Sequence, residues 1–271
     1  MPGRFDTASR ADSRLGLRLL AAAVIAPIEL ACAVAGDWWF TGLVLVVAAV
    51  AAWEWSALQT RGRFLPVLGV GCALAFPLSL ALGILTLAPL ALSIAISAGI
   101  LLLPRSGDAE SLTTGALAVV GSICVGCLLV PAIALRGADN GVAWLLTVIL
   151  GTWACDTLAF AIGRRRGTHR LGLWMSPNKT IEGTISGILA AAVVGVLAGF
   201  VFPSVAVKLL GLGVVVGLST VGGDLVESAV KRRLGVKDMG WIIPGHGGIL
   251  DRIDGQLYSV LFGYLFVTLT P

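Results

Sequence analysis

The sequence predicts an all-α, polytopic integral membrane protein with about nine transmembrane helices. The chain is 57% hydrophobic and only 13% charged. Its mean hydropathy of +0.96 over 271 residues exceeds what a water-soluble domain of this length sustains. Apolar runs near twenty residues recur, and such a run crosses the roughly 30 Å hydrocarbon layer as a helix. The runs are continuous and do not alternate, which disfavours barrel strands.

Nine candidate spans can be placed, with centres near residues 25, 48, 74, 94, 125, 152, 193, 213 and 262. The third and fourth are the least regular, because prolines lie in or between them, and a re-entrant hairpin is the alternative. The run at 15–35 is too long for a signal peptide, so we interpret it as a retained first span. We expect one membrane-embedded domain, 1–271, with an N-terminal arm at 1–14, helices over about 15–140 and a chemically active half over about 141–271.

The basic residues are concentrated on one side of the membrane in this predicted topology. If the N-terminus is cytoplasmic, seventeen of the nineteen lie in inner connections, and only Arg136 and Lys208 lie outside. The positive-inside rule then places the polar connections 163–183 and 222–252 in the cytoplasm and the C-terminus outside, in a cytoplasmic (inner) membrane. The net charge of +4 is accounted for by topology, and we expect no nucleic-acid partner.

A few polar or reactive side chains lie within the apolar runs. The five cysteines are interpreted as small buried apolar residues, because the one CxxC pair, at 124 and 127, has no second pair or nearby histidine. Glu54 lies between two tryptophans, which predicts an interfacial position. Glu29 lies deeper, and no role is predicted for it.

Residues 222–254 concentrate the charge of the chain. This stretch holds five of the fifteen acidic residues, five of the nineteen basic ones and one of the two histidines. If the helix of the eighth span continues into it, spacings of three and four residues place Asp224, Glu227 and Lys231 on one stripe. The alternative is an interfacial helix end with a simple Glu227–Lys231 ion pair.

A second acidic pair, Asp251 and Asp254, follows a glycine-rich loop, PGHGG at 244–248. Carboxylates on two neighbouring helices suit Mg²⁺, which leaves coordination positions for substrate phosphates, and glycines let backbone amides approach an anion. His246 is either a general base or a group that holds the loop or binds phosphate. These ingredients match phosphoryl or nucleotidyl transfer. The nearby cationic partners for phosphate are Lys231, Arg232, Arg233 and Arg252.

The other polar stretch runs from Asp156 to residue 183. A carboxylate within a span is costly and is by default a functional candidate. The segment 176–183 (SPNKTIEG) precedes the seventh span, so its backbone amides would lie at a helix N-terminus and could hold phosphate, with Lys179 adding charge. The basic run at 164–166 is equally well explained as a topology signal.

Two sets of motifs carry a family resemblance. Downstream these are Ser228-x-x-Lys231-Arg232, Lys237-Asp238, Pro244-x-His246-Gly247-Gly248 and Asp251-Arg252-x-Asp254. Upstream they are Asp156 with Gly163, and Ser176-Pro-x-Lys179-Thr180-x-Glu182-Gly183. Over about residues 150–255 the chain resembles phosphatidate cytidylyltransferases, also called CDP-diacylglycerol synthases; before that the likeness is topological. Two departures, Phe160 for tyrosine and Leu173 for proline, touch no carboxylate or lysine.

The resemblance implies that CTP and phosphatidate give CDP-diacylglycerol and pyrophosphate. It also implies a Mg²⁺ requirement, with a second metal or monovalent cation left open, a homodimer among membrane lipids, and an active site at the cytoplasmic membrane boundary. The expected catalytic residues are Asp224, Asp251, Lys231, Arg252 and His246. The expected substrate-binding residues are Ser176, Lys179, Thr180, Arg232, Gly247 and Gly248. The expected metal ligands are Asp224 and Asp251, with Asp156, Glu227 and Asp254 as additional or outer groups.

Two alternatives remain open at this point. Within the same class, the acceptor would be a different lipid phosphate. In a different class, Asp156, Asp224 and Asp251 would bind a cation for transport. A transporter is expected to place its acids near mid-membrane, whereas most acids here lie at the predicted cytoplasmic ends of spans, which favours an enzyme.

Overall fold

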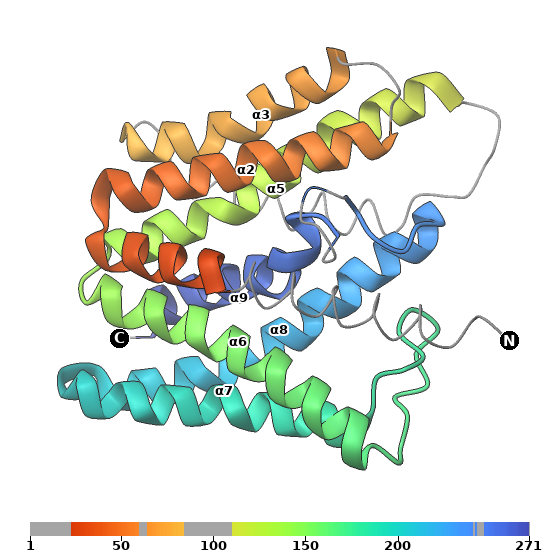
Figure 1. Ribbon diagram of the computed structural model, residues 1–271. Coiled ribbons are helices and arrows are strands. Elements are labelled where there is room, and N and C mark those ends of the chain that lie inside the picture. Colours follow the sequence, from red (N-terminus) through yellow and green to blue (C-terminus); the bar gives the residue numbers. More distant parts are fainter. Residues whose placement is uncertain (1–22, 60–63, 84–109, 241, 243–246, 271) are drawn as a thin grey trace, which may run out of the picture.

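The computed structural model describes residues 23–59, 64–83, 110–240, 242 and 247–270. In this part of the chain the regular structure is helical, and the only extended pairing is an isolated bridge between Arg170 and Thr180, so the all-α prediction is confirmed there (Figure 1). The predicted span near residue 94 and the candidate residue His246 lie outside the described residues.

The helices match the predicted spans. Each of the other eight predicted centres falls within a helix, and six helices are long and apolar enough to cross a membrane: α2, α3, most of α5, α6, α7 and α8. The bounds are Ala23–Ala35, α2 (Asp37–Gln59), α3 (Phe64–Ala81), α5 (Glu110–Gly137), α6 (Gly141–Arg166), α7 (Ile181–Val201), the 3₁₀ turn η1 (Pro203–Val205), α8 (Ala206–Leu234) and α9 (Leu250–Leu269). The described part of the chain therefore supports a polytopic membrane protein with six candidate spans, and the prediction of nine spans stays a prediction.

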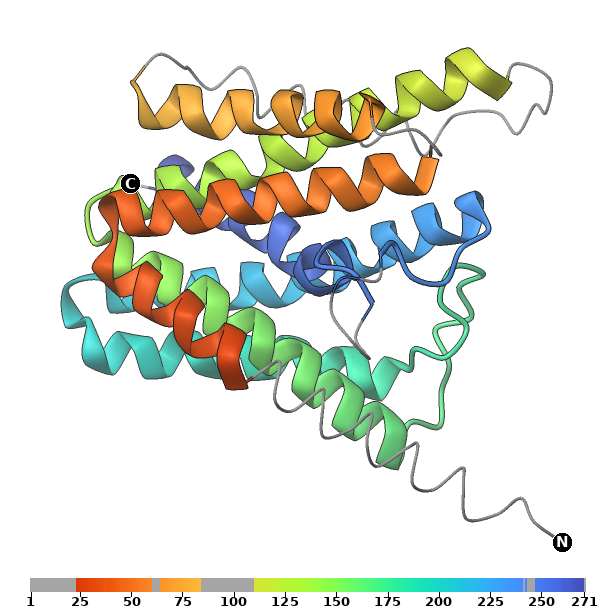
Figure 2. The ribbon, with the colours of Figure 1, turned by 45° about the horizontal axis from the view of Figure 1, so that its top comes forward.

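The helices form two groups that α9 joins. Helices α2, α3 and α5 pack on one another, and α6, α7 and α8 form the second group. Helix α9 contacts α8 and α6 on one side and α5 on the other, and Figures 1 and 2 show it between the two groups. Its buried side chains Leu257, Val260 and Leu261 belong to the common apolar core. Residues at the start of α9 are thereby held at the junction of the two groups.

Small residues bring α6, α7 and α8 close together. A Cβ at Gly187 of α7 would lie 2.8 Å from the Cys155 carbonyl oxygen of α6, and one at Gly195 would lie 2.3 Å from the Leu209 carbonyl oxygen of α8. Small residues at such contacts are typical of membrane helices, because packing and hydrogen bonding replace the hydrophobic effect there.

Buried hydroxyl groups also connect α8 with its neighbours. The Thr220 and Ser259 hydroxyl oxygens lie 2.8 Å apart, which links α8 to α9, and Thr220 also lies 3.5 Å from the Thr152 hydroxyl of α6. Hydroxyl pairs of this kind stabilise helix contacts inside a bilayer by about 1 kcal/mol or less. Together with the glycine contacts they fix the three helices that border the candidate site.

The two long polar connections lie at the same end of the bundle. The connections after α6 and after α8 both leave from that end, whereas α9 finishes at the opposite end (Figure 1). The two basic residues that the topology placed outside also lie at the opposite end. There Arg136 Nε donates to the Ala33 carbonyl at 2.7 Å, and Lys208 Nζ donates to the Thr270 carbonyl at 3.0 Å. Which end faces the cytoplasm stays a prediction.

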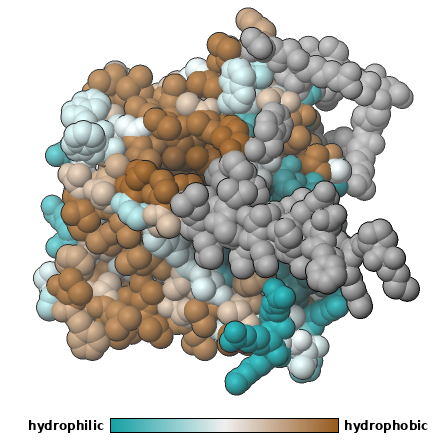
Figure 3. All heavy atoms as spheres, viewed as in Figure 1, coloured by the Kyte–Doolittle hydropathy of each residue, from teal (hydrophilic) through white to brown (hydrophobic). Residues whose placement is uncertain are grey.

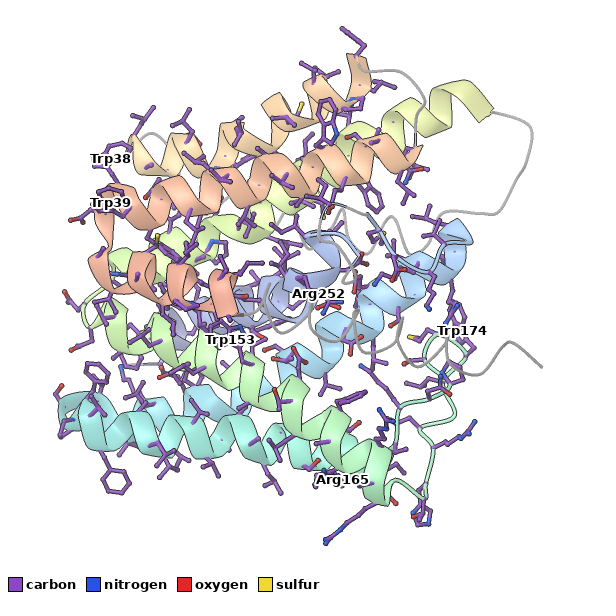
Figure 4. All side chains as sticks on the ribbon, in the orientation of Figure 1. Trp38, Trp39, Trp153, Arg165, Trp174 and Arg252 are labelled. Atoms are coloured by element: carbon purple, nitrogen blue, oxygen red, sulfur yellow. The ribbon has the colours of Figure 1, made fainter. Side chains whose placement is uncertain are left out.

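The surface has the character expected of a bilayer protein. Apolar residues cover much of the face in Figure 3, and hydrophilic residues gather where α6 ends and its connection to α7 begins. Exposed tryptophans mark both ends in Figure 4: Trp38 and Trp39 at one, Trp174 at the other. Tryptophan is enriched at membrane–water interfaces, so these residues are suited to the two boundaries.

Candidate active site

A polar cavity of about 540 Å³ opens between α6, α7, α8 and the start of α9. Its walls combine carboxylates, cationic side chains and the connection that precedes α7. Among the residues predicted from the sequence, those that line it are Asp156, Ser176, Lys179, Thr180, Asp224, Asp251, Arg252 and Asp254. Its other lining residues include Phe160, Gly163, Arg164, Asn178, Gly183 and Thr184. The structure therefore brings the two separately predicted polar stretches together.

Lys179 connects the segment before α7 to α8. Its ammonium nitrogen lies 2.6 Å from Asp224 Oδ2, and the Ser228 hydroxyl donates to Asp224 Oδ1 at 3.4 Å. Helix α8 continues unbroken past its paired glycines, which meets the condition set in the sequence analysis, and this continuation carries Asp224 to the cavity wall. The Lys179 and Asp224 side chains are 22% and 36% exposed, so both remain accessible to a ligand.

Asp251 is the most completely bonded acid of the site. Its carboxylate accepts from Lys231 Nζ at 2.6 Å, from the Met239 amide at 2.9 Å and from the Gly248 amide at 2.8 Å, and its side chain is only 2% exposed. Gly247 has φ +85°, and a Cβ there would lie 2.7 Å from Asp251 Oδ2. Glycine is therefore required at 247 both for its backbone conformation and for the approach of the carboxylate.

Lys231 joins α8 to α9 through two acids. Its ammonium lies 2.9 Å from Glu227 Oε1, one helical turn earlier on α8, and 2.6 Å from Asp251 Oδ1 on α9. Lys231 thus connects the predicted stripe on α8 with Asp251 of the second acidic pair. Glu227, Lys231, Gly247 and Gly248 are not among the described residues that line the cavity. Lys231 and both glycines contact the Asp251 carboxylate. Arg232 is exposed near the end of α8 and is not among the described lining residues.

The N-terminus of α7 is formed as predicted and is already capped. Thr180 is the N-cap, and its Oγ1 accepts from the Gly183 amide at 3.2 Å. Glu182 in the first turn accepts from the Thr168 hydroxyl at 2.6 Å and from the His169 amide at 3.1 Å, which fixes the connection after α6. Lys179, next to this cap, contributes a positive charge of the segment to the cavity.

The contacts of two residues were not predicted from the sequence. Arg164, treated there as a topology signal as much as a functional group, lines the cavity with its guanidinium 6.0 Å from the Phe160 ring centre, a cation–π distance. Glu54, predicted to be interfacial, is 1% exposed and accepts hydrogen bonds from the backbone at the start of α9, contacts that were not predicted from the sequence; its depth in the membrane stays a prediction. Its position between tryptophans gave no signal of these distant partners. Glu29, for which no role was predicted, accepts from the Gln256 side chain of α9.

The donor set of the cavity fits a magnesium ion by chemistry. Four carboxylates, of Asp156, Asp224, Asp251 and Asp254, line it, and oxygen ligands are those that Mg²⁺ prefers. Among the described residues no three acidic, histidine or cysteine side chains already converge on one point, and lysines form ion pairs with two of the carboxylates. Metal binding would therefore need Lys179 or Lys231 to turn toward another anion, such as a phosphate.

The fold and the cavity define a helical membrane protein whose site, lined by acidic, arginine and lysine side chains, suits a phosphorylated substrate. The chain belongs to the cytidylyltransferase family, whose model matches residues 16–270. It is similar to proteins named phosphatidate cytidylyltransferase: 46% identical over 123 residues to those of Staphylococcus saprophyticus and Staphylococcus aureus, and 48% to that of Staphylococcus epidermidis. Each match covers 44% of this chain and 47% of the relative, so the matched part spans about half the length of these curated relatives.

Proposed function

We propose that this chain transfers the cytidylyl group of CTP to phosphatidate in a Mg²⁺-dependent reaction that yields CDP-diacylglycerol and pyrophosphate. The observation that carries the proposal is the cavity in which Lys179 and Asp224 face Asp251 and Arg252, in a chain of the cytidylyltransferase family. The relatives named phosphatidate cytidylyltransferase support the choice of lipid.

The reaction needs no strong base. The phosphate of phosphatidate is already anionic, so one of its oxygens attacks the α-phosphorus of CTP directly. The bond from that phosphorus to the bridging oxygen breaks, and pyrophosphate leaves with the electron pair. The barrier arises from repulsion between anions and from the demand for an in-line approach, which positioned cations reduce.

Cationic side chains on different walls suit this task. Lys179 enters from the segment before α7, Arg164 from the end of α6 and Arg252 from α9. A triphosphate and a lipid phosphate together carry more negative charge than one lysine can offset, so cations on several walls can hold both at once. Ser176 and Thr180 offer hydroxyl groups beside Lys179 for the nucleotide.

The metal would be held by carboxylates from two helices. We propose Asp224 of α8 and Asp251 of α9 as its ligands, with Asp156, Asp254 and Glu227 as further or outer groups. When bound, Mg²⁺ supplies charge neutralisation at the phosphates. Lys179 and Lys231 each lie 2.6 Å from one of these two carboxylates and would help to position them. A second metal or a monovalent cation is compatible with the number of acids.

The remaining parts of the proposal concern assembly. We propose that the cavity faces the cytoplasm in a cytoplasmic (inner) membrane, that the chain crosses it nine times, and that it acts as a homodimer. The gathering of both basic connections at one end supports the orientation. Labelling of single introduced cysteines in intact cells tests the orientation, and the mass of the purified protein in detergent, measured by light scattering, tests the dimer.

The choice of acceptor is tested with a panel of lipids. Purified protein in detergent receives labelled CTP, Mg²⁺ and, in separate reactions, phosphatidate, a prenyl phosphate or lysophosphatidate. We expect a labelled lipid with phosphatidate at least about tenfold faster than with the others. Faster product formation with a prenyl phosphate would favour the alternative acceptor. No lipid product with any phosphatidate species would reject the proposed function and return the cation transporter to consideration.

A further inference from the structure

Glu54 is a buried acid in the N-terminal half of the chain, of which no described residue lines the cavity. It lies on α2, one of the helices of the first group, and is 1% exposed. Its Oε2 accepts from the Ile249 amide at 2.7 Å and from the Leu250 amide at 3.2 Å, and its Oε1 accepts from the Ile242 amide at 3.4 Å. These partners lie 188 to 196 residues further along the chain.

The amides that Glu54 binds belong to the start of α9. Ile249 is the N-cap of α9 and makes no capping bond with its own side chain, and Leu250 is the first helical residue. The first amides of any helix lack partners within the helix and need an acceptor. Glu54 supplies that acceptor from another helix, and its negative charge is also favourable at a helix N-terminus.

Two carboxylates thus accept hydrogen bonds from backbone amides in the loop between α8 and α9 and at the start of α9. Asp251 accepts from the amides of Met239 and Gly248, and Glu54 accepts from those of Ile242, Ile249 and Leu250. One carboxylate lies at the cavity and the other lies at the junction with α2. The described residues of the loop are therefore held from both sides.

The loop is shaped to receive this acid. A Cβ at Gly240 would lie 2.4 Å from Glu54 Cδ, and one at Gly248 would lie 2.4 Å from Glu54 Oε2. A side chain at either position would displace the carboxylate. Among the described residues, the hydrogen bonds to Glu54 all come from backbone amides, so the contact specifies the course of the loop and not the identity of a basic partner.

We propose that Glu54 is a positioning residue for the reaction: it fixes residues 247–250 and the first turn of α9, so that Asp251 and Arg252 face the cavity. The proposal rests on the proposed function for its catalytic consequence. Its structural consequence, that α2 holds the loop before α9, does not depend on the proposed function. It gives the first group of helices a role at a site whose described walls come from the second group and α9.

The test compares Glu54→Gln with Glu29→Gln. Both remove one charge from an acid of the N-terminal half, but only Glu54 binds the loop, because Glu29 contacts the side chain of Gln256 further along α9. In Glu54→Gln one carboxylate oxygen is replaced by an NH₂ group, which would face backbone N–H groups that need an acceptor. We expect kcat to fall by about a hundredfold, as for a misplaced catalytic group, with the KM for CTP changed less than about threefold because Lys179 is on the opposite wall. Glu29→Gln should keep kcat within about twofold.

Hydrogen exchange gives a readout that does not depend on turnover. In Glu54→Gln, amides in a peptide covering 239–250 should exchange about tenfold faster, the expected effect of losing a helix cap, while peptides of α6 and α7 keep their wild-type rates. Unchanged exchange at 239–250, or equal acceleration in every helix, would overturn the positioning role. If the wild-type protein makes no CDP-diacylglycerol, the proposed function fails, but the exchange result still shows whether Glu54 holds the loop.

Gly240→Ala perturbs the same contact from the side of the loop. Its new Cβ meets the Glu54 carboxylate, so it should reproduce the local acceleration of exchange and the loss of kcat. A shorter acid leaves room for that Cβ. The double variant Glu54→Asp with Gly240→Ala should therefore lose less than the product of the two single losses. Losses that multiply independently would contradict a direct contact between the two positions.

Discussion

Replacing Asp251 by asparagine tests the centre of the site with a minimal change of shape. The wild-type carboxylate accepts from Lys231 at 2.6 Å and from the amides of Met239 and Gly248. Asparagine keeps one oxygen acceptor but replaces the other with an NH₂ donor, which faces either a backbone amide or the ammonium group. A hydrogen bond to a charged group contributes about 1.5–3 kcal/mol, and leaving its buried partner unpaired adds to the loss.

The expected consequence of Asp251→Asn is a large loss of turnover in a folded protein. If about 3 kcal/mol of this interaction is needed in the transition state, kcat falls by about two powers of ten. The assay measures CDP-diacylglycerol formed from labelled CTP at saturating substrates. Thermal unfolding and monodisperse elution in detergent are followed in parallel, and we expect the variant to remain folded because Lys231 keeps its contact with Glu227.

A matched control separates the site from the charge change. Asp139 is exposed in the turn between α5 and α6, at the end of the bundle opposite the cavity. Asp139→Asn removes the same charge and should keep kcat within about twofold. An Asp251→Asn protein that retains more than about a tenth of the wild-type rate would refute the role given to this carboxylate.

Other substitutions test separate parts of the site. Lys179→Met removes the partner of Asp224 and a phosphate-binding cation, so kcat/KM for CTP should fall at least about tenfold, and an unchanged value would exclude Lys179 from the nucleotide site. Gly247→Ala places a Cβ against Asp251 at a φ of +85°, and should lower both turnover and the free energy of unfolding, by about 1–3 kcal/mol, in thermal melts. Thr220→Val removes a buried hydroxyl contact between α8 and α9. It should cost about 1 kcal/mol of stability or less while turnover stays within about twofold; a large loss of turnover would show that this hydroxyl does more than join helices.

Local patterns were sufficient to predict the helices and the main acids. Apolar runs predict spans because a bilayer leaves backbone groups no partner outside a helix. Spacings of three and four residues predicted that Glu227 and Lys231 would share a face of α8, and they form an ion pair there. Asp224 and Asp251, predicted to act together, both line the cavity. Their role as metal ligands stays a prediction.

The contacts that sequence patterns missed are long-range. Glu54 bonds the loop before α9 across 188 to 196 residues, and no periodicity within α2 encodes that partner. Arg164 belongs to a basic run that topology alone explains, and only the packing of α6 against α7 turns it toward the cavity. The Lys179–Asp224 pair likewise depends on how the connection before α7 folds back, which the Arg170–Thr180 bridge fixes.

The position of the label in the lipid product tests the proposed chemistry most directly. Purified protein is given phosphatidate, Mg²⁺ and CTP labelled with ³²P at either the α or the γ phosphorus, and lipid and aqueous products are separated. Cytidylyl transfer predicts that the α label enters the lipid as CDP-diacylglycerol and that the γ label is recovered in pyrophosphate, in equal amounts. A γ label in the lipid, or an α label that stays wholly in the aqueous phase, would contradict it.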